Sequence, residues 1–76
     1  MKELIELIAR ELVDRPDEVE ATAVEEEESI VVELTVDPDD LGKVIGKRGR
    51  TARALRTLLS AAGAKAGQRY ELEILD

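Results

Sequence analysis

The stretch Val44-Ile45-Gly46-Lys47-Arg48-Gly49-Arg50 places two cations between two glycines, and the segments on either side are arranged around it. An apolar pair precedes the first glycine, and an amphipathic pattern with helical spacing follows the second. Because the two glycines leave little side-chain bulk, the stretch predicts a tight turn between two helices at residues 46–49. The backbone of such a turn can approach a negatively charged group closely.

The two helices beside this turn are delimited by capping residues and by apolar spacing. The first is expected over about residues 38–45, with Asp37 as its N-cap and Pro38 at its first position. The second is expected over about residues 50–62. Two glycines, Gly63 and Gly67, mark its C-terminal end. The side chains expected to face the core from these helices are Leu41, Val44, Ile45, Leu55, Leu58, Leu59 and Ala62.

The remaining segments predict one more helix and three strands. Residues 2–13 carry a helical apolar stripe, which is Leu4, Ile5, Ile8 and Leu12, widened by Leu7 and Val13. Residues 30–36 alternate with the period of a strand, and residues 19–26 and 69–75 do so more weakly. The order is α-β-β-α-α-β in a single domain, residues 1–76. We therefore expect an α+β fold with a three-stranded sheet and helices on one face.

Charge is divided unevenly along the chain. Residues 42–70 hold eight cations and no acid, whereas residues 1–41 carry a net charge of −12, and the whole chain has a net charge of −7. An acid-free window of this length indicates a basic face on an acidic body, which is typical of a polyanion-binding protein. The alternative is a solvated basic helix face that is balanced by acids elsewhere.

The composition argues against several functions. The chain has no Cys and no His, which removes thiol nucleophiles, histidine bases and the usual zinc and haem ligands, so neither an enzyme nor a cofactor is expected. Asp37, Asp39 and Asp40 lack the spacing of a calcium loop and suit helix capping, and residues 25–28 read as a solvated acidic turn. No apolar run is long enough to cross a bilayer, and the absence of Cys fits a reducing compartment.

The turn at residues 46–49 is predicted to hold a nucleic-acid backbone. Its amides and the first N–H groups of the following helix can meet phosphate oxygens, and the helix dipole points the same way. Lys47 and Arg48 add cations at the turn, and three further arginines continue the positive field along the helix, namely Arg50, Arg53 and Arg56. The only aromatic residue is Tyr70, which disfavours modules that bind single strands by stacking.

These residues resemble the Gly-x-x-Gly signature of the KH domain, whose loop clamps the backbone of about four unpaired nucleotides. The KH core would span about residues 30–75. A helix and a strand precede it, which is similar to the type II arrangement. The length, the run from Leu12 to Val19, the run from Gly42 to Thr57 and the closing Leu72 to Asp76 resemble the small stand-alone bacterial KH proteins of the KhpA family. The resemblance implies a cytoplasmic RNA-binding protein that forms homodimers and pairs with a larger KH protein, in pathways of cell elongation and division.

The nine residues expected to contact RNA lie at the loop or beside it: Lys43, Val44, Ile45, Gly46, Lys47, Arg48, Gly49, Arg50 and Arg53. KH grooves place bases on an aliphatic floor, for which Val44 and Ile45 are candidates, with Val36 or Val32 on the strand side. Plain core packing is the alternative for each of these four.

Two function classes remain open from the sequence. One is a single-stranded RNA binder of weak sequence preference, such as a post-transcriptional regulator or RNA chaperone-like factor, with no small-molecule substrate and no membrane. The other is a protein-interaction module in which a KH surface docks another KH chain and RNA contact is secondary. Single-stranded DNA stays open as the ligand, because a clamp on phosphates does not read the 2′-OH.

Overall fold

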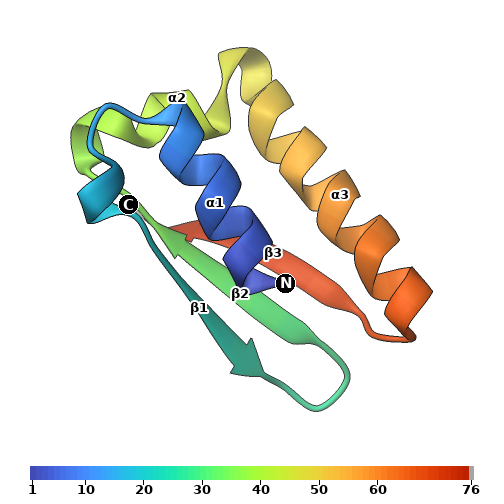
Figure 1. Cartoon of the computed structure of the whole chain (residues 1–76). Helices are drawn as coiled ribbons and strands as arrows, with labels where there is room; N and C mark the ends of the chain where they lie inside the picture. Colours follow the sequence, from blue (N-terminus) through green and yellow to red (C-terminus); the bar gives the residue numbers. More distant parts are fainter. Residues whose placement is uncertain (76) are drawn as a thin grey trace.

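A computed structural model describes residues 1–75, in which the expected α+β class and order of elements are confirmed (Figure 1). Three α-helices and three strands make up the fold: α1 (Lys2–Leu12), β1 (Glu20–Glu25), β2 (Ile30–Thr35), α2 (Leu41–Ile45), α3 (Arg50–Ala66) and β3 (Tyr70–Leu75). Single 3₁₀ turns at Pro16–Glu18, Pro38–Asp40 and Lys47–Gly49 lead into β1, α2 and α3. No helix within residues 1–75 is long and apolar enough to span a membrane.

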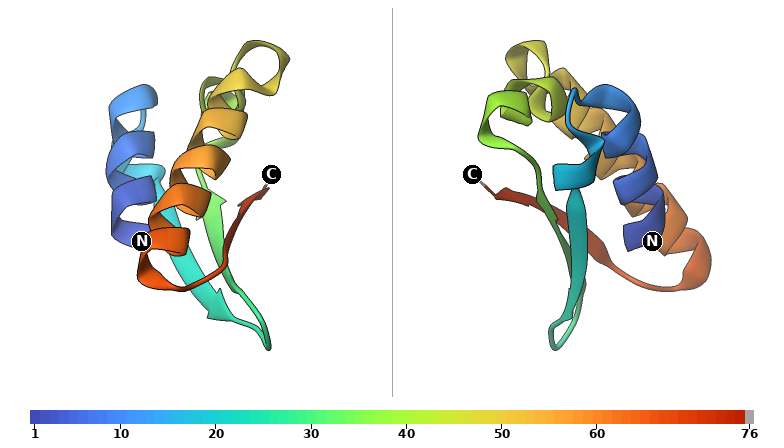
Figure 2. Two further views of the ribbon diagram at one scale, coloured as in Figure 1. Left: turned by 90° about the vertical axis from the view of Figure 1, so that its right-hand side faces the viewer. Right: turned by 60° about the vertical axis from the view of Figure 1, so that its left-hand side comes forward.

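The sheet is mixed, with β2 in the centre. It pairs antiparallel with β1 and parallel with β3. In the register, Leu34 lies between Ala21 and Ile74, and these three residues face the helices. Figure 2 shows all the helices on this side of the sheet and none on the other. The core is therefore a single layer between the sheet and the helices, as the alternation in residues 30–36 predicts.

Helix α1 packs on β1 and β2 through fewer residues than its apolar stripe suggests. Ile5 and Ala9, one turn apart, are completely buried, whereas the Leu7 side chain is 59% exposed. A helix lying on a sheet buries only the face in contact with it, and Leu7 lies off that face. The expectation that Leu7 widens the buried stripe is wrong.

Helix α3 is longer than the sequence predicts, because Gly63 lies inside it and does not end it. A Cβ on Gly63 would lie 2.6 Å from the Gln68 carbonyl oxygen and 2.7 Å from Tyr70 Cδ2. The glycine therefore lets the chain entering β3 approach the helix. The helix ends at Gly67, where the Gln68 N–H donates to the Gly63 carbonyl oxygen at 2.8 Å and the Gly67 N–H donates to that of Ala64 at 3.2 Å. This is a Schellman motif, and its left-handed residue is Gly67 (φ 72°).

The packing at Gly63 predicts opposite effects for two Gly→Ala substitutions. Gly63→Ala should lower the free energy of unfolding by about 1–3 kcal/mol, because the new methyl group overlaps backbone that cannot move freely. Gly42→Ala, in helix α2 with open space around the glycine, should raise it by about 0.5–1 kcal/mol. Urea unfolding followed by circular dichroism measures both. Equal effects of the two substitutions would contradict the assigned role of Gly63.

Candidate nucleic-acid interface

The turn between α2 and α3 has a backbone that favours glycine at both ends. Gly46 has φ 77° and ψ 169°, and Gly49 has φ 74° and ψ 15°, so both lie at positive φ. Arg48 also has positive φ (59°), and it is the one residue other than glycine in residues 1–75 to do so. A side chain with a Cβ at this conformation is strained, and such strain is found where a loop serves a function.

Gly46 has a second constraint from the first turn of α3. A Cβ there would overlap the side chain of Thr51 and would lie 2.8 Å from its backbone nitrogen. At Gly49, by contrast, no atom lies within 4 Å of the equivalent position. Gly46 is therefore required by both its backbone angle and its packing, whereas Gly49 is required by its backbone angle alone.

The amides of this turn are only partly free, which corrects the expectation that all of them face a ligand. The Gly46 N–H donates to the Gly42 carbonyl oxygen at 2.8 Å, and the Gly49 N–H donates to that of Gly46 at 3.0 Å. The Arg50 N–H also donates, to the Lys47 carbonyl oxygen. Gly46, with ψ 169°, interrupts the helix before Lys47, and within residues 1–75 the amides of Lys47 and Arg48 donate to no side chain and to no loop carbonyl. Two adjacent donors thus remain at the tip of the turn.

The cations beside these amides are exposed and unpaired. Lys47 and Arg48 project from the turn, and Arg50, Arg53 and Arg56 follow on the solvent side of α3. None of the five forms an ion pair with any residue that the structure describes. Their positive field is therefore not cancelled locally, and it adds to the positive end of the α3 dipole.

Lys43 differs from these five cations, because two carboxylates already hold its ammonium group. Its Nζ lies 3.0 Å from Asp14 Oδ2 and 3.2 Å from Asp40 Oδ1. Hydrogen bonds to Asp14 and Asp40 raise the pKa of Lys43 above its ordinary value. The contribution of Lys43 to a phosphate site is reduced accordingly, although it lies close to the turn in sequence.

Asp40 is the buried residue among Asp14, Asp40 and Lys43. The sequence suggested only that Asp40 caps a helix. Burial disfavours its charged form, but the backbone amides of Arg15 and Asp14 and the ammonium of Lys43 outweigh this effect and hold the pKa of Asp40 below its ordinary value. The Arg15 N–H donates to Asp40 Oδ2 at 3.0 Å. This carboxylate thereby ties the segment after α1 to the start of α2.

The proposed aliphatic floor is largely core. Val44 is 0% exposed and packs among the central residues of the core, so it supports the turn from behind and presents no surface to a ligand. Val32 of β2 and Val36, which follows the strand, are buried as well. Only Ile45, 36% exposed, offers apolar surface beside the turn. The predicted contact of Val44 with a base is therefore wrong, because helix packing occupies that side chain.

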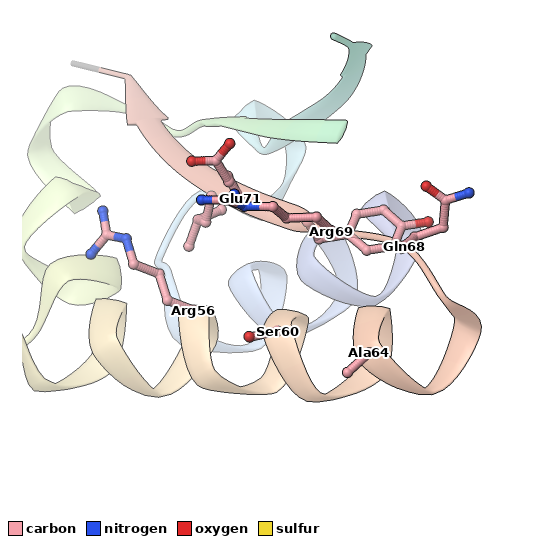
Figure 3. A pocket seen from close by; sticks show the side chains of 8 residues that line it. Arg56, Ser60, Ala64, Gln68, Arg69 and Glu71 are labelled. Carbon is pink, nitrogen blue, oxygen red and sulfur yellow. The ribbon is translucent and has the colours of Figure 1, made fainter. Parts of the chain in front are cut away.

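A groove between α3 and β3 extends the basic surface away from the turn (Figure 3). Its volume is about 530 Å³, and its polar lining comes from Arg56 and Ser60 of the helix and from Gln68, Arg69 and Glu71 at the strand. Ser60, Gln68 and Arg69 were not among the predicted contacts. The acid-free window contained them, but only the packing of β3 beside α3 brings them together.

The order of strands, the two helices and the turn with glycines at both ends define a KH domain. The KhpA/KhpB KH-domain family model matches residues 2–74, and the chain belongs to this family. It is 58% identical to the RNA-binding protein KhpA of Aquifex aeolicus over 76 residues, which is 100% of this chain and 96% of the relative. It is 52% identical to the protein of the same name from Clostridium perfringens over 75 residues, 99% of this chain and 100% of the relative. No solved structure matches the chain significantly.

The buried carboxylate predicts a pH-dependent contribution to stability. Because the pKa of Asp40 is lowered in the folded state, its contribution is fully present above about its ordinary value of 3.8 and is lost as the pH falls through the folded-state pKa. Asp40→Asn should therefore lower the free energy of unfolding at pH 7. The difference from the unsubstituted protein should shrink in acid below that ordinary value. Urea unfolding at several pH values measures this difference.

Asp39→Asn is the matched control, because Asp39 is exposed and its carboxylate makes no hydrogen bond or ion pair within residues 1–75. It should change stability little at any pH. A difference for Asp40→Asn that stays constant into acid would contradict the role given to the charge.

Proposed function

We propose that this protein binds single-stranded RNA, with the turn at residues 46–49 holding the sugar–phosphate backbone. The observation that carries the proposal is the pair of free amides at Lys47 and Arg48, which lie on an exposed turn with two unpaired cations. Amides and cations side by side on one exposed turn suit phosphate oxygens, which accept several hydrogen bonds each. Membership of a family whose named relatives are RNA-binding proteins supports the same ligand.

The strand is proposed to continue from the turn along α3. Arg50, Arg53 and Arg56 supply positive charge on the helix, and Ile45 supplies apolar surface beside the turn. The groove between α3 and β3 then offers hydroxyl, amide and guanidinium groups to base edges. Because one domain contacts only a few nucleotides, affinity for a single site is expected to be modest.

We place the protein in the cytoplasm as a post-transcriptional regulator or RNA chaperone-like factor. It would act as a homodimer or together with a larger KH-containing protein, since linking two weak sites raises overall affinity by their effective concentration. A role in cell elongation and division belongs to the same proposal.

The second candidate function is a protein-interaction module, and the outer side of α3 favours it. Ala54, Leu58 and Ala61 form a shallow hollow beside Arg50 and Arg53, and Leu58 is 40% exposed. Small side chains around an exposed leucine allow a second helix to approach closely. A copy of the same α3 packed there would produce a symmetric dimer, in which each helix covers the other.

Reversing the charge of the turn should abolish RNA binding. Lys47→Asp together with Arg48→Asp replaces the two cations by acids beside the same amides, so affinity for a short single-stranded RNA should fall at least about tenfold. Fluorescence anisotropy measures the affinity, and circular dichroism should stay unchanged because both side chains are exposed. Unchanged affinity would favour the interaction-module function.

Lys2→Asp together with Lys65→Asp provides the control, since it makes the same change in net charge at the start of α1 and at the end of α3. Figure 1 shows both of these helix ends away from the turn between α2 and α3. This variant should bind RNA nearly normally. For the unsubstituted protein, the logarithm of the affinity should fall by about 0.7 per tenfold increase in salt for each phosphate neutralised. A salt-independent affinity would show that the basic surface does not contact the RNA. Binding of a DNA oligonucleotide of the same sequence tests for recognition of the 2′-OH.

A dimer formed through the outer side of α3 should be weakened by a substitution in the hollow. Leu58→Glu places a charge in the hollow on α3 and should raise the dissociation constant of self-association at least about tenfold, as measured by analytical ultracentrifugation. Leu7→Glu is the matched control, because Leu7 is a more exposed leucine on α1. Dimers that survive Leu58→Glu would place the dimer interface elsewhere.

A further inference from the structure

The sheet has a second face, opposite the helices, that nothing in residues 1–75 covers (Figure 2). The strand register assigns nine residues to it, and we refer to them as the outer sheet face: Glu20, Thr22, Val24, Val31, Glu33, Thr35, Glu71, Glu73 and Leu75. The register pairs these residues with one another across the strands, and none belongs to the core. This face shares no residue with the turn or with the nine predicted RNA contacts. A ligand bound here would leave the turn free, although Glu71 also lines the groove between α3 and β3.

The charge of the outer sheet face is strongly negative. Four of its nine residues are glutamates and none is a cation, although Arg69 lies just before β3. Glu33 and Glu73 are direct partners across β2 and β3, with Glu71 two residues along the same strand. No glutamate of this face forms an ion pair within the described part of the chain. Like charges on directly opposed residues destabilise a sheet, so the repulsion remains uncompensated in the isolated domain.

Apolar side chains lie among these acids. Val24 and Val31 are partners across β1 and β2, and Val24 is 37% exposed. Glu71 is the partner of Val31 on the other side, so apolar and acidic residues are neighbours in one row. Leu75 lies at the far end of β3, next to Thr35. An apolar strip bordered by a single sign of charge is complementary to an apolar strip bordered by the opposite sign.

The size of the face fits one helix. Each strand has six residues, which span about 20 Å, and the two outer strands lie about 10 Å apart. An α-helix with its side chains is about 10–12 Å across, so a helix of about four turns would cover the face. Layers of helix on both faces of a sheet are a stable architecture, and the inner face already has its helices.

We propose that the outer sheet face is a docking surface for a basic amphipathic helix of a partner protein. The helix would place Leu or Val side chains on Val24 and Val31, with Lys and Arg side chains at Glu33, Glu71 and Glu73. Such a helix would bring cations to the glutamate pair and remove its repulsion. The charge complementarity favours this occupant over a second copy, because the basic surface of this chain is the one that binds RNA in the proposed function.

The test uses two synthetic peptides and the full chain. One 18-residue peptide carries a leucine stripe flanked by Lys and Arg, and the control peptide carries the same stripe flanked by Gln. Isothermal titration calorimetry should show saturable binding of the basic peptide and at least about tenfold weaker binding of the control peptide. Glu33→Lys should weaken binding of the basic peptide by about fivefold or more, and it should fold well because it places a cation opposite Glu73.

Glu27→Lys is the matched variant, since it makes the same charge change in the exposed turn between β1 and β2, outside the face. Its effect should be below about twofold, and both variants should bind RNA as the unsubstituted protein does. Equal loss of peptide binding in the two variants would show attraction to net charge alone and overturn the proposal. Peptide-induced NMR shifts confined to α3, or self-association of the chain that Glu33→Lys abolishes, would overturn it as well.

Discussion

The backbone conformation of the turn at residues 46–49 is the constraint on which the proposed RNA-binding surface depends. Two helices meet there through three residues at positive φ, and Thr51 occupies the space where a side chain on Gly46 would lie. This geometry interrupts the helical hydrogen bonds at Lys47 and Arg48 and begins α3 directly after them. The path of α3 then fixes the position of β3, since Gly63 allows the two to approach closely.

The fold also separates charge. The acid-free window becomes α2, the turn and α3, whereas many of the acids lie on β1, in the turn after it and on the outer sheet face. Asp14 and the buried Asp40 lie beside Lys43 and compensate that cation. The uncompensated positive field is thereby concentrated at Lys47, Arg48 and the arginines of α3. A molecule with net negative charge can in this way present a basic surface to a polyanion.

Particular residues show where reasoning from the sequence succeeded and where it failed. The alternation in residues 30–36 predicted β2 and its buried side, because a strand sends successive side chains to opposite faces. Gly63 was expected to mark the exit of α3, since glycine disfavours helices, yet close contact with Gln68 and Tyr70 is what requires it. Val44 was a candidate ligand contact from its place beside the loop, but helix packing buries it completely.

The sequence by itself determined the order of elements, the turn with its two glycines and the basic window, because these follow from local spacing and composition. Only the tertiary structure decided which amides of the turn stay free, which cation is neutralised and which residues line the groove beside α3. Those properties depend on contacts between segments far apart in the chain, such as Asp40 with Arg15. The outer sheet face belongs to the same group, because the register alone brings Glu33 and Glu73 side by side.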